Sequence, residues 1–144
     1  MISELTQDLI NKIKSVPALQ NRVGAAVGGT EADPTMANAP LPYSWVIFGG
    51  STPTGDSMQD GGQQYWLTQY QFTIVTGIAY GSTEADLLNN QLPVLEAIEK
   101  AVAGTKAFKY AGLWEFQGAD LAKIDTDRMI YQIKFSVDGF NQAT

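Results

Sequence analysis

The sequence predicts an α+β fold, a largely antiparallel sheet of four or five strands with two helices packed on one face. Two segments repeat apolar residues at helical spacing, whereas others are rich in aromatic and β-branched residues or alternate between apolar and polar positions. These patterns follow the order helix, strands, helix, strands. No crossover helix separates the first two long strands, so we expect them to be antiparallel.

Composition limits the classes of protein to which the chain can belong. Its 144 residues suit one domain, taken as residues 1–144, and 44% apolar with 17% charged residues is typical of a folded chain. No apolar run approaches the roughly 20 residues of a membrane-spanning helix. The first residues lack the basic and apolar stretch of a secretory signal. We therefore expect no membrane partner and synthesis in the cytoplasm.

The chain contains no cysteine and no histidine. This excludes disulfides, thiolate nucleophiles, Ser-His-Asp triads and thiolate or imidazole metal sites, and it leaves carboxylate, lysine, tyrosine or Mg²⁺ chemistry. The net charge is −6, and the nine lysines and arginines are scattered, which disfavours tight binding to nucleic-acid phosphates. We expect a protein without cofactor, metal or catalytic residues.

The first predicted helix covers residues 4–15. Leu5, Leu9 and Ile13 recur at helical spacing, and Pro17 stands where the pattern ends. A short strand at residues 23–27 and an extended segment follow.

The next strands are predicted at residues 43–48 and 65–75. The first is aromatic and β-branched, apolar on both faces and preceded by a proline, which suits a central strand. The second alternates, as a half-buried strand does. Its predicted apolar face consists of Trp66, Tyr70, Phe72 and Ile74.

The second predicted helix covers residues 84–103. Thr83 is its expected N-cap, and Gly104 is its expected end. Pro93 removes one internal hydrogen bond, so we expect a kink near residues 89–93. The predicted apolar stripe consists of Leu88, Leu92, Leu95, Ile98 and Val102.

Two strands are predicted after this helix, at residues 109–118 and 128–138. The first holds Leu113, Trp114 and Phe116. The second alternates most regularly. Its predicted apolar face consists of Met129, Tyr131, Ile133, Phe135 and Val137.

Residues 49–64 are predicted to form a long loop, because they are rich in glycine and hold almost nothing that could be buried. Loops of more than about a dozen residues are usually functional or disordered. We hypothesise that this loop contacts other protein subunits, which would order it. The candidate interface residues are Thr52, Thr54, Asp56, Met58, Gln59, Asp60 and Gln63.

Two patterns in this loop resemble ligand sites. Residues 50–57 have the spacing of a phosphate-binding loop, but Asp56 stands where the motif needs its lysine and would repel phosphates. Asp56 and Asp60 loosely resemble a calcium loop without its alternating oxygen ligands. We interpret the region as a solvated loop.

Other residues could line a site elsewhere in the chain. One acidic group comprises Glu115, Asp120, Asp125 and Asp127. These carboxylates could pair as general acid and base in a cleft, but a charged hairpin connection is favoured. The aromatic residues on the strands could line a ligand pocket, yet packing in the core or an interface is the favoured interpretation.

The order of these elements is similar to that of a known family. A short helix ends before a Pro/Gly-rich segment, Pro42-Tyr43 leads into an apolar strand, and a glycine-rich loop and a long strand follow. The helix at 84–103 and the alternating strand at 129–137 complete the pattern. Over nearly the whole chain this resembles the tail terminator (tail completion) proteins of long-tailed bacteriophages.

The resemblance implies a structural virion protein at the tail–neck junction, assembled in the host cytoplasm. It implies a ring, taken as a hexamer, that caps the tail tube, ends its polymerisation and joins the tail to the head-side connector or neck. The partners would be further copies, the tail tube protein, the connector and possibly the tail sheath. DNA would pass through without specific binding, and channel-facing carboxylates would keep it from sticking.

Two alternatives stay open. The chain could be another neck or tube-sheath connector subunit of a phage or phage-like injection machine. It could also be a small enzyme that uses Asp, Glu or Tyr, for which a deep pocket with convergent carboxylates would speak.

Overall fold

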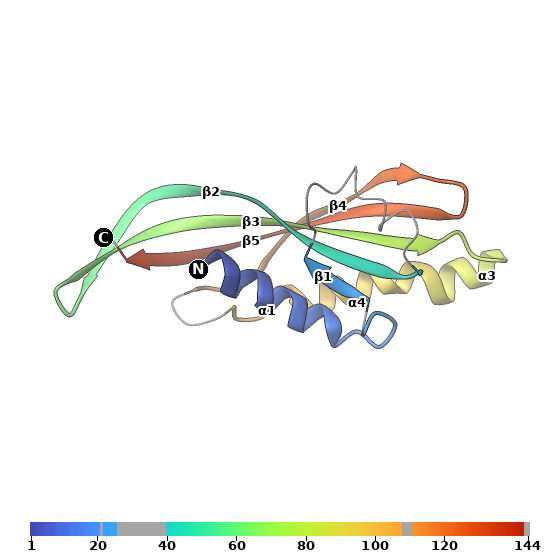
Figure 1. Ribbon diagram of the computed structural model, residues 1–144, viewed down its shortest axis with the longest axis horizontal. Coiled ribbons are helices and arrows are strands. Elements are labelled where there is room, and N and C mark those ends of the chain that lie inside the picture. The colour runs from blue at the N-terminus through green and yellow to red at the C-terminus, as the bar shows by residue number, and fades with distance from the viewer. Residues whose placement is uncertain (21, 26–39, 108–110, 143–144) are drawn as a thin grey trace.

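The computed structural model describes residues 1–20, 22–25, 40–107 and 111–142. These residues form one five-stranded sheet in the order β1-β2-β3-β5-β4, with the helices on one of its faces (Figure 1). The predicted α+β class is confirmed. The elements are α1 (Ile2–Lys14), β1 (Val23–Ala25), β2 (Tyr43–Asp60), β3 (Gln63–Ala79), α3 (Glu84–Asp86), η2 (Leu87–Gln91), α4 (Leu92–Val102), β4 (Glu115–Ile124) and β5 (Arg128–Gln142).

The sheet is antiparallel except at its β1 edge. The short strand β1 is parallel to β2, whereas β2 with β3, β3 with β5, and β5 with β4 are antiparallel. The predicted antiparallel pairing of the first two long strands is confirmed, with Tyr43 opposite Gly77. Most of the predicted segment before β2 lies outside the described residues.

The hydrophobic core lies between the sheet and the helices. Leu5, Leu9 and Ile13 of α1 and Ile98 and Val102 of α4 are fully buried, as their helical spacing predicts. The sheet contributes Phe72 and Ile74 from β3 and Ile133, Phe135 and Val137 from β5. We call this side of the sheet the helix face and the other side the open face. No helix of the described residues is long and apolar enough to cross a membrane.

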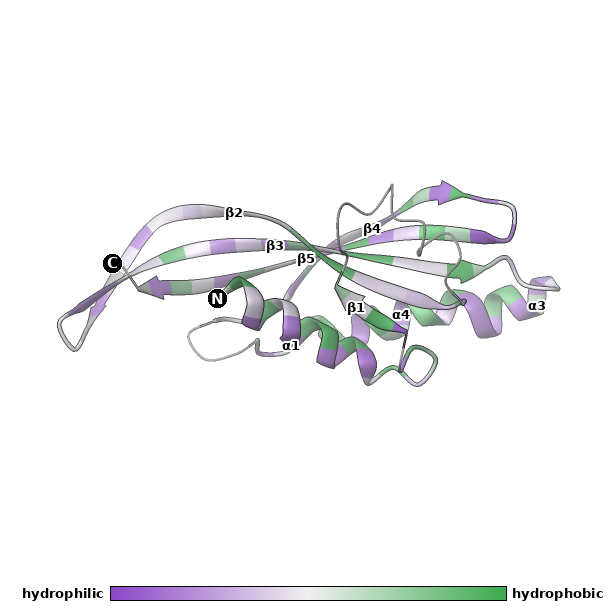
Figure 2. Ribbon diagram, viewed as in Figure 1, coloured by the Kyte–Doolittle hydropathy of each residue, from purple (hydrophilic) through white to green (hydrophobic). Residues whose placement is uncertain are grey.

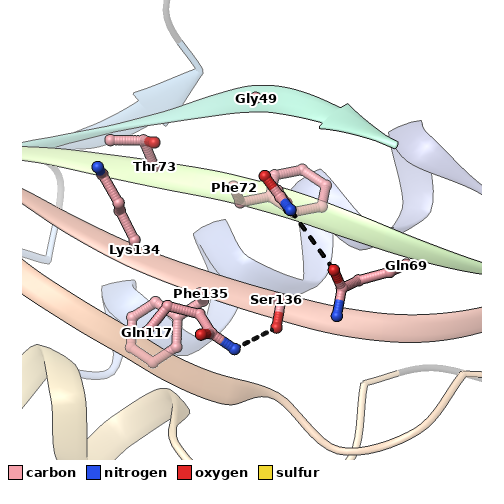
Figure 3. Close-up of a pocket in the computed structure, with 9 residues that line it drawn as sticks. Gly49, Gln69, Phe72, Thr73, Gln117, Lys134, Phe135 and Ser136 are labelled. Carbon is pink, nitrogen blue, oxygen red and sulfur yellow. Dashed lines mark hydrogen bonds between the residues drawn. The ribbon is translucent and has the colours of Figure 1, made fainter. Parts of the chain in front are cut away.

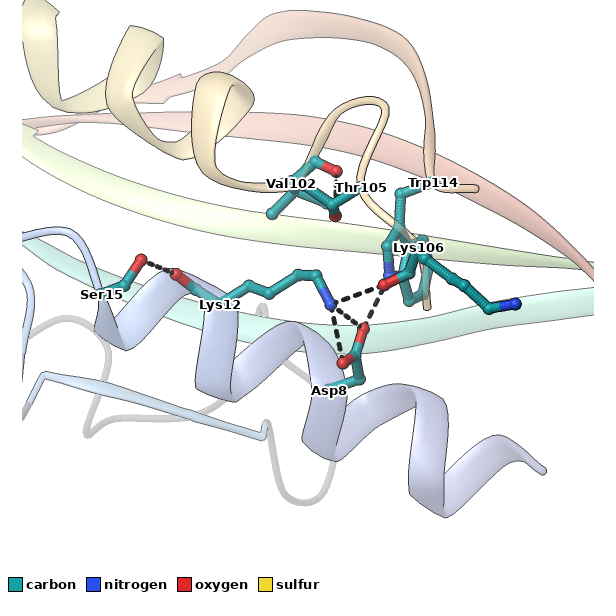
Figure 4. Close-up of polar contacts among 7 residues, drawn as sticks. All are labelled: Asp8, Lys12, Ser15, Val102, Thr105, Lys106 and Trp114. Carbon is teal, nitrogen blue, oxygen red and sulfur yellow. Dashed lines mark hydrogen bonds and ion pairs between the residues drawn. The ribbon is translucent and has the colours of Figure 1, made fainter. Parts of the chain in front are cut away.

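A polar contact fixes α1 to the segment before β4. Trp114, buried in the core, donates its Nε1 hydrogen to Asp8 Oδ2 at 2.8 Å. Lys12 Nζ lies 2.7 Å from the same carboxylate and donates to the carbonyl oxygen of Lys106 at 3.0 Å (Figure 4). The Asp8 carboxylate therefore accepts the hydrogen bond of the buried Trp114 indole. Through Lys12 it also connects α1 to the loop that contains Lys106.

The second helical segment begins where the sequence predicts. The Thr83 hydroxyl accepts a hydrogen bond from the Asp86 N–H at 3.0 Å. The expected irregularity takes the form of the π-helical turn η2, which directly precedes the turn that holds Pro93. The wider turn shifts the helical face, so Leu88 is 54% exposed and its predicted place in the apolar stripe is wrong. Val94 is buried instead.

The predicted loop at residues 49–64 is wrong. The segment continues β2 to Asp60, turns at Gly61 and Gly62, and returns as β3, forming a hairpin that extends beyond the helices (Figure 1). Both turn glycines have positive φ, 60° and 81°, as a two-residue hairpin turn requires. The chain needs few apolar residues here because none of the described helices covers the outer part of this hairpin. We call residues 49–69 the arm.

The strand predicted at residues 109–118 is also displaced. The observed strand β4 spans Glu115–Ile124, and residues 109–110 lie outside the described residues. Register irregularities follow Phe116 and Leu121. Each inserts a residue and breaks the alternation that would have marked the strand.

Candidate protein-interaction interface

The predicted interface residues all lie on the outer half of the hairpin. Thr52 pairs with Gln69 at the base of the arm, and Asp60 pairs with Gln63 beside the turn. The structure brings them together as a ladder rather than as a loop. Gln63 begins β3, and the other six belong to β2: Thr52, Thr54, Asp56, Met58, Gln59 and Asp60.

A bulge interrupts the arm between Pro53 and Ser57. Thr54 holds its geometry, since its hydroxyl donates to the Leu67 carbonyl oxygen at 3.2 Å and accepts from the Asp56 N–H at 3.4 Å. Gly55 within the bulge has a φ of 88°. Side-chain hydrogen bonds and a glycine thus replace the regular ladder here.

The arm is polar and nearly bare. Its residues are mostly exposed, and Figure 2 shows it in purple and white over most of its length. On its inner side β5 extends the pairing as far as Tyr65, opposite Gln142. Trp66 lies on the helix face of the arm with 45% of its surface exposed. A large aromatic side chain beyond the core is a typical anchor for a protein partner.

The edge strand β4 carries a second exposed apolar group. Phe116, Leu121 and Ile124 lie on the helix face, where the described helices do not cover β4, and they are 38%, 46% and 61% exposed. The sequence prediction missed Leu121 and Ile124. Their spacing of three residues breaks the alternation expected of a strand, because the irregularity of β4 that follows Leu121 inserts a residue between them.

The open face of the sheet has a shallow polar hollow of about 360 Å³ (Figure 3). Gln117 Nε2 donates to Ser136 Oγ at 2.7 Å, and Lys134 is the charged residue of its lining. The remaining polar lining comes from Gln69, Gln71 and Thr73. None of the described residues that line the hollow is a carboxylate, so they provide no pair of Asp or Glu residues.

Near the β4–β5 turn a small cluster of side chains around Tyr43 packs on the open face. The Arg128 guanidinium lies 5.9 Å from the centre of the Tyr43 ring and donates to both oxygens of Asp127 at 2.9 Å. This bond lowers the pKa of Asp127, whereas burial raises the pKa of the Tyr43 hydroxyl. The Arg128 guanidinium thus joins Asp127, beside the turn, to the Tyr43 ring on the sheet.

The acidic group found in the sequence does not converge. Glu115 and Asp120 lie on β4, and Asp125 and Asp127 lie in or beside the turn to β5, as the predicted hairpin connection requires. Among the described residues, no three Asp or Glu residues come together in a way that could hold a metal ion.

No family model and no curated protein matches the sequence. Among solved structures, the chain is similar to a chain from the virion of a native gene transfer agent (GTA) particle, with a TM-score of 0.52. The similarity covers 97% of both chains at 12% sequence identity. It therefore concerns the fold of the whole domain.

Proposed function

We propose that this protein is a structural subunit of a virion, and that it is a tail terminator. Copies of it form a ring, taken as a hexamer, that caps the tail tube, ends tube polymerisation and joins the tail to the head-side connector or neck. The observation that carries this proposal is the end-to-end similarity in fold to a virion protein. The order of sequence elements supports the same family.

The surface of the molecule supports assembly rather than catalysis. A bare hairpin arm and an edge strand with exposed apolar side chains are both open to other protein chains. The hollow on the open face is shallow and lacks paired carboxylates. This arrangement does not favour the alternative of a carboxylate enzyme.

A different neck or tube-sheath connector subunit is the second candidate function. It would share the fold, the arm and the virion location, so the fold does not separate the two. The difference is functional, since a terminator stops growth of the tube and a connector does not. In both cases the partners are virion proteins, and DNA passes without specific binding.

Tube assembly in vitro tests the proposal. The protein is first sized by light scattering and imaged by electron microscopy, where closed rings are expected. It is then added to polymerising tail tube protein from the same virion. We expect tubes to become shorter as its concentration rises, with a ring visible at one end.

A shortened-arm variant is the control. Because Thr52 and Gln69 are directly paired, an Asn-Gly turn can replace residues 53–68 between them. The variant should fold as a monomer and leave tube length unchanged. Tubes that grow normally in the presence of unmodified rings would support the connector instead, and a monomer with a measurable turnover would reject both structural functions.

A further inference from the structure

Each outer edge of the sheet is covered at one end and open at the other. On one edge β1 pairs with Ser44–Val46 of β2, and from there to Asp60 no described residue pairs with the outer side of β2. On the opposite edge Ala111 bridges to Gly139 of β5, whereas β4 has β5 as its sole described strand partner. The two open stretches lie at opposite ends of the molecule (Figure 1).

Both open stretches carry exposed apolar groups on the same face. Leu121 and Ile124 project from the helix face of β4, and Trp66 projects from the helix face of the arm, directly inside the open edge at Ser57. An unpaired strand with apolar side chains on one face is the arrangement that accepts a further strand.

We infer that β4 of one copy pairs with the open part of β2, in the arm of the next copy. This deepens the proposed function, on which it rests, by naming the surfaces that would join neighbours in the ring. Because β2, β3, β5 and β4 alternate in direction, β2 and β4 run oppositely. A neighbour in the same orientation as the first copy therefore places its own β2 antiparallel to β4 of the first copy. Most strand pairs within this sheet are antiparallel as well.

A second copy fits this edge better than other occupants. The ten residues of β4 fit within the open stretch of β2 from Ile47 to Asp60, and this pairing places Phe116 of one copy on the same face as Trp66 of the other. Pairing of two β4 strands with each other would close a dimer and leave both arms unpaired, whereas the unlike pairing continues from copy to copy.

Pairing of β4 with β2 would also allow the row of copies to close into a ring. Open stretches at opposite ends shift each neighbour along the strand direction. A shift of this kind closes into a ring when the strands are tilted against the ring axis, as they are in β-barrels.

Cross-linking between single cysteines tests the inference, since the natural chain has none. Thr52→Cys labels the arm and Ala122→Cys labels β4, and both positions are exposed. The two variants carry different affinity tags, are mixed, and are treated with a short bis-maleimide. We expect cross-links between unlike variants to exceed those between like variants by about tenfold, and Glu99→Cys on α4 to give none with either.

The outcomes separate this inference from the proposed function. Rings without arm-to-β4 cross-links would overturn the pairing and leave the ring. Arm-to-β4 cross-links in open chains that never cap a tube would keep the pairing and overturn the terminator. A monomer without cross-links, or mainly like-to-like links, would overturn the pairing as well.

Charged substitutions give a second measurement. Leu121→Lys and Ile124→Lys place a charge on the open edge and should lower the association constant by about tenfold each, equivalent to 1.4 kcal/mol. Leu88→Lys is the matched control, because Leu88 is 54% exposed on the helix and not on β4. Equal effects of all three lysines on ring formation would contradict the inference.

Discussion

Asp8 connects three parts of the molecule through a single carboxylate. It accepts from the buried Trp114 indole and from Lys12, which in turn binds the Lys106 carbonyl oxygen. The side chains of Asp8 and Lys12 are each about one fifth exposed, so this pair is shielded more than a surface ion pair is. The sequence pattern placed Trp114 in the strand predicted at residues 109–118, packed in the core or an interface, and nothing in it indicates that the indole nitrogen needs an acceptor from α1.

Removing the acceptor should therefore destabilise the fold. We expect Asp8→Leu to lower the free energy of unfolding by about 1–3 kcal/mol, because the Trp114 N–H stays buried without a partner. Asp8→Asn keeps an acceptor oxygen and should cost less. Urea unfolding measures both variants, and equal losses would show that the charge of Asp8 matters more than the indole hydrogen bond.

Gly77 provides space for the ring of the opposite residue. A Cβ at this position would lie 2.4 Å from a ring carbon of Tyr43, so Gly77→Ala must displace the buried ring. We expect a loss of about 1–3 kcal/mol in the free energy of unfolding. Gly24→Ala is the control, since its Cβ would meet the Trp45 ring at 3.5 Å, an ordinary contact. Similar losses for both would contradict this account.

At the scale of elements, the start of the second helical segment depends on charge. The pKa of Asp86 is lowered from its ordinary 3.8, chiefly because Asn90 donates to its side chain, and also because the Ser82 N–H does. A depressed pKa means that the carboxylate stabilises the folded state above the ordinary value. That contribution is lost as the pH falls through the folded-state pKa.

The pH dependence of an Asp86→Asn variant follows from this sign. The variant should be less stable than the natural chain near neutral pH, and the difference should disappear in acid, once the pH is below the lowered folded-state pKa of Asp86. Thermal unfolding across this range measures it. Glu96→Gln removes one charge from the exposed side of α4 and serves as the control. A difference that persists in acid would rule out the charge as its cause.

Sequence patterns predicted elements that pack against the core and missed those that do not. The buried faces of α1, β3 and β5 follow regular spacing because one side of each meets the core. The described helices leave the outer part of the arm uncovered, so its glycines and polar residues resemble a loop, although they serve a bulge and a turn. The register irregularities of β4 break the alternation from which this strand would have been predicted.

At the scale of the whole molecule, we expect the core to fold without the outer part of the arm. The buried cluster ends near Tyr70, and the predicted interface residues lie beyond it. The shortened-arm variant described above should therefore unfold cooperatively, with little change in its helical circular dichroism. A broad or shifted transition would show that the arm supports the core, and loss of rings could then not be assigned to the arm alone.

The candidate interface was proposed from the sequence because the segment lacks apolar residues; its role stays a prediction, and its predicted loop conformation is wrong. The predicted residues do form one continuous surface. The β4 surface could not be found in this way. It becomes visible only when the sheet order shows β4 to be an edge and the helices are seen to leave it uncovered.

A third strand, β5, pairs with the β3 side of the arm and continues from there into the main part of the sheet. Because β5 accompanies β3 to Tyr65, a load on the tip passes along backbone hydrogen bonds to Gly139, over which the side chains of Met1 and Tyr70 pack. Met1, the N-cap residue of α1, therefore lies beside the root of the arm, because Gly139 pairs with Thr68. A partner that binds the tip would therefore hold a segment that is joined by strand pairing to residues beside the hydrophobic core.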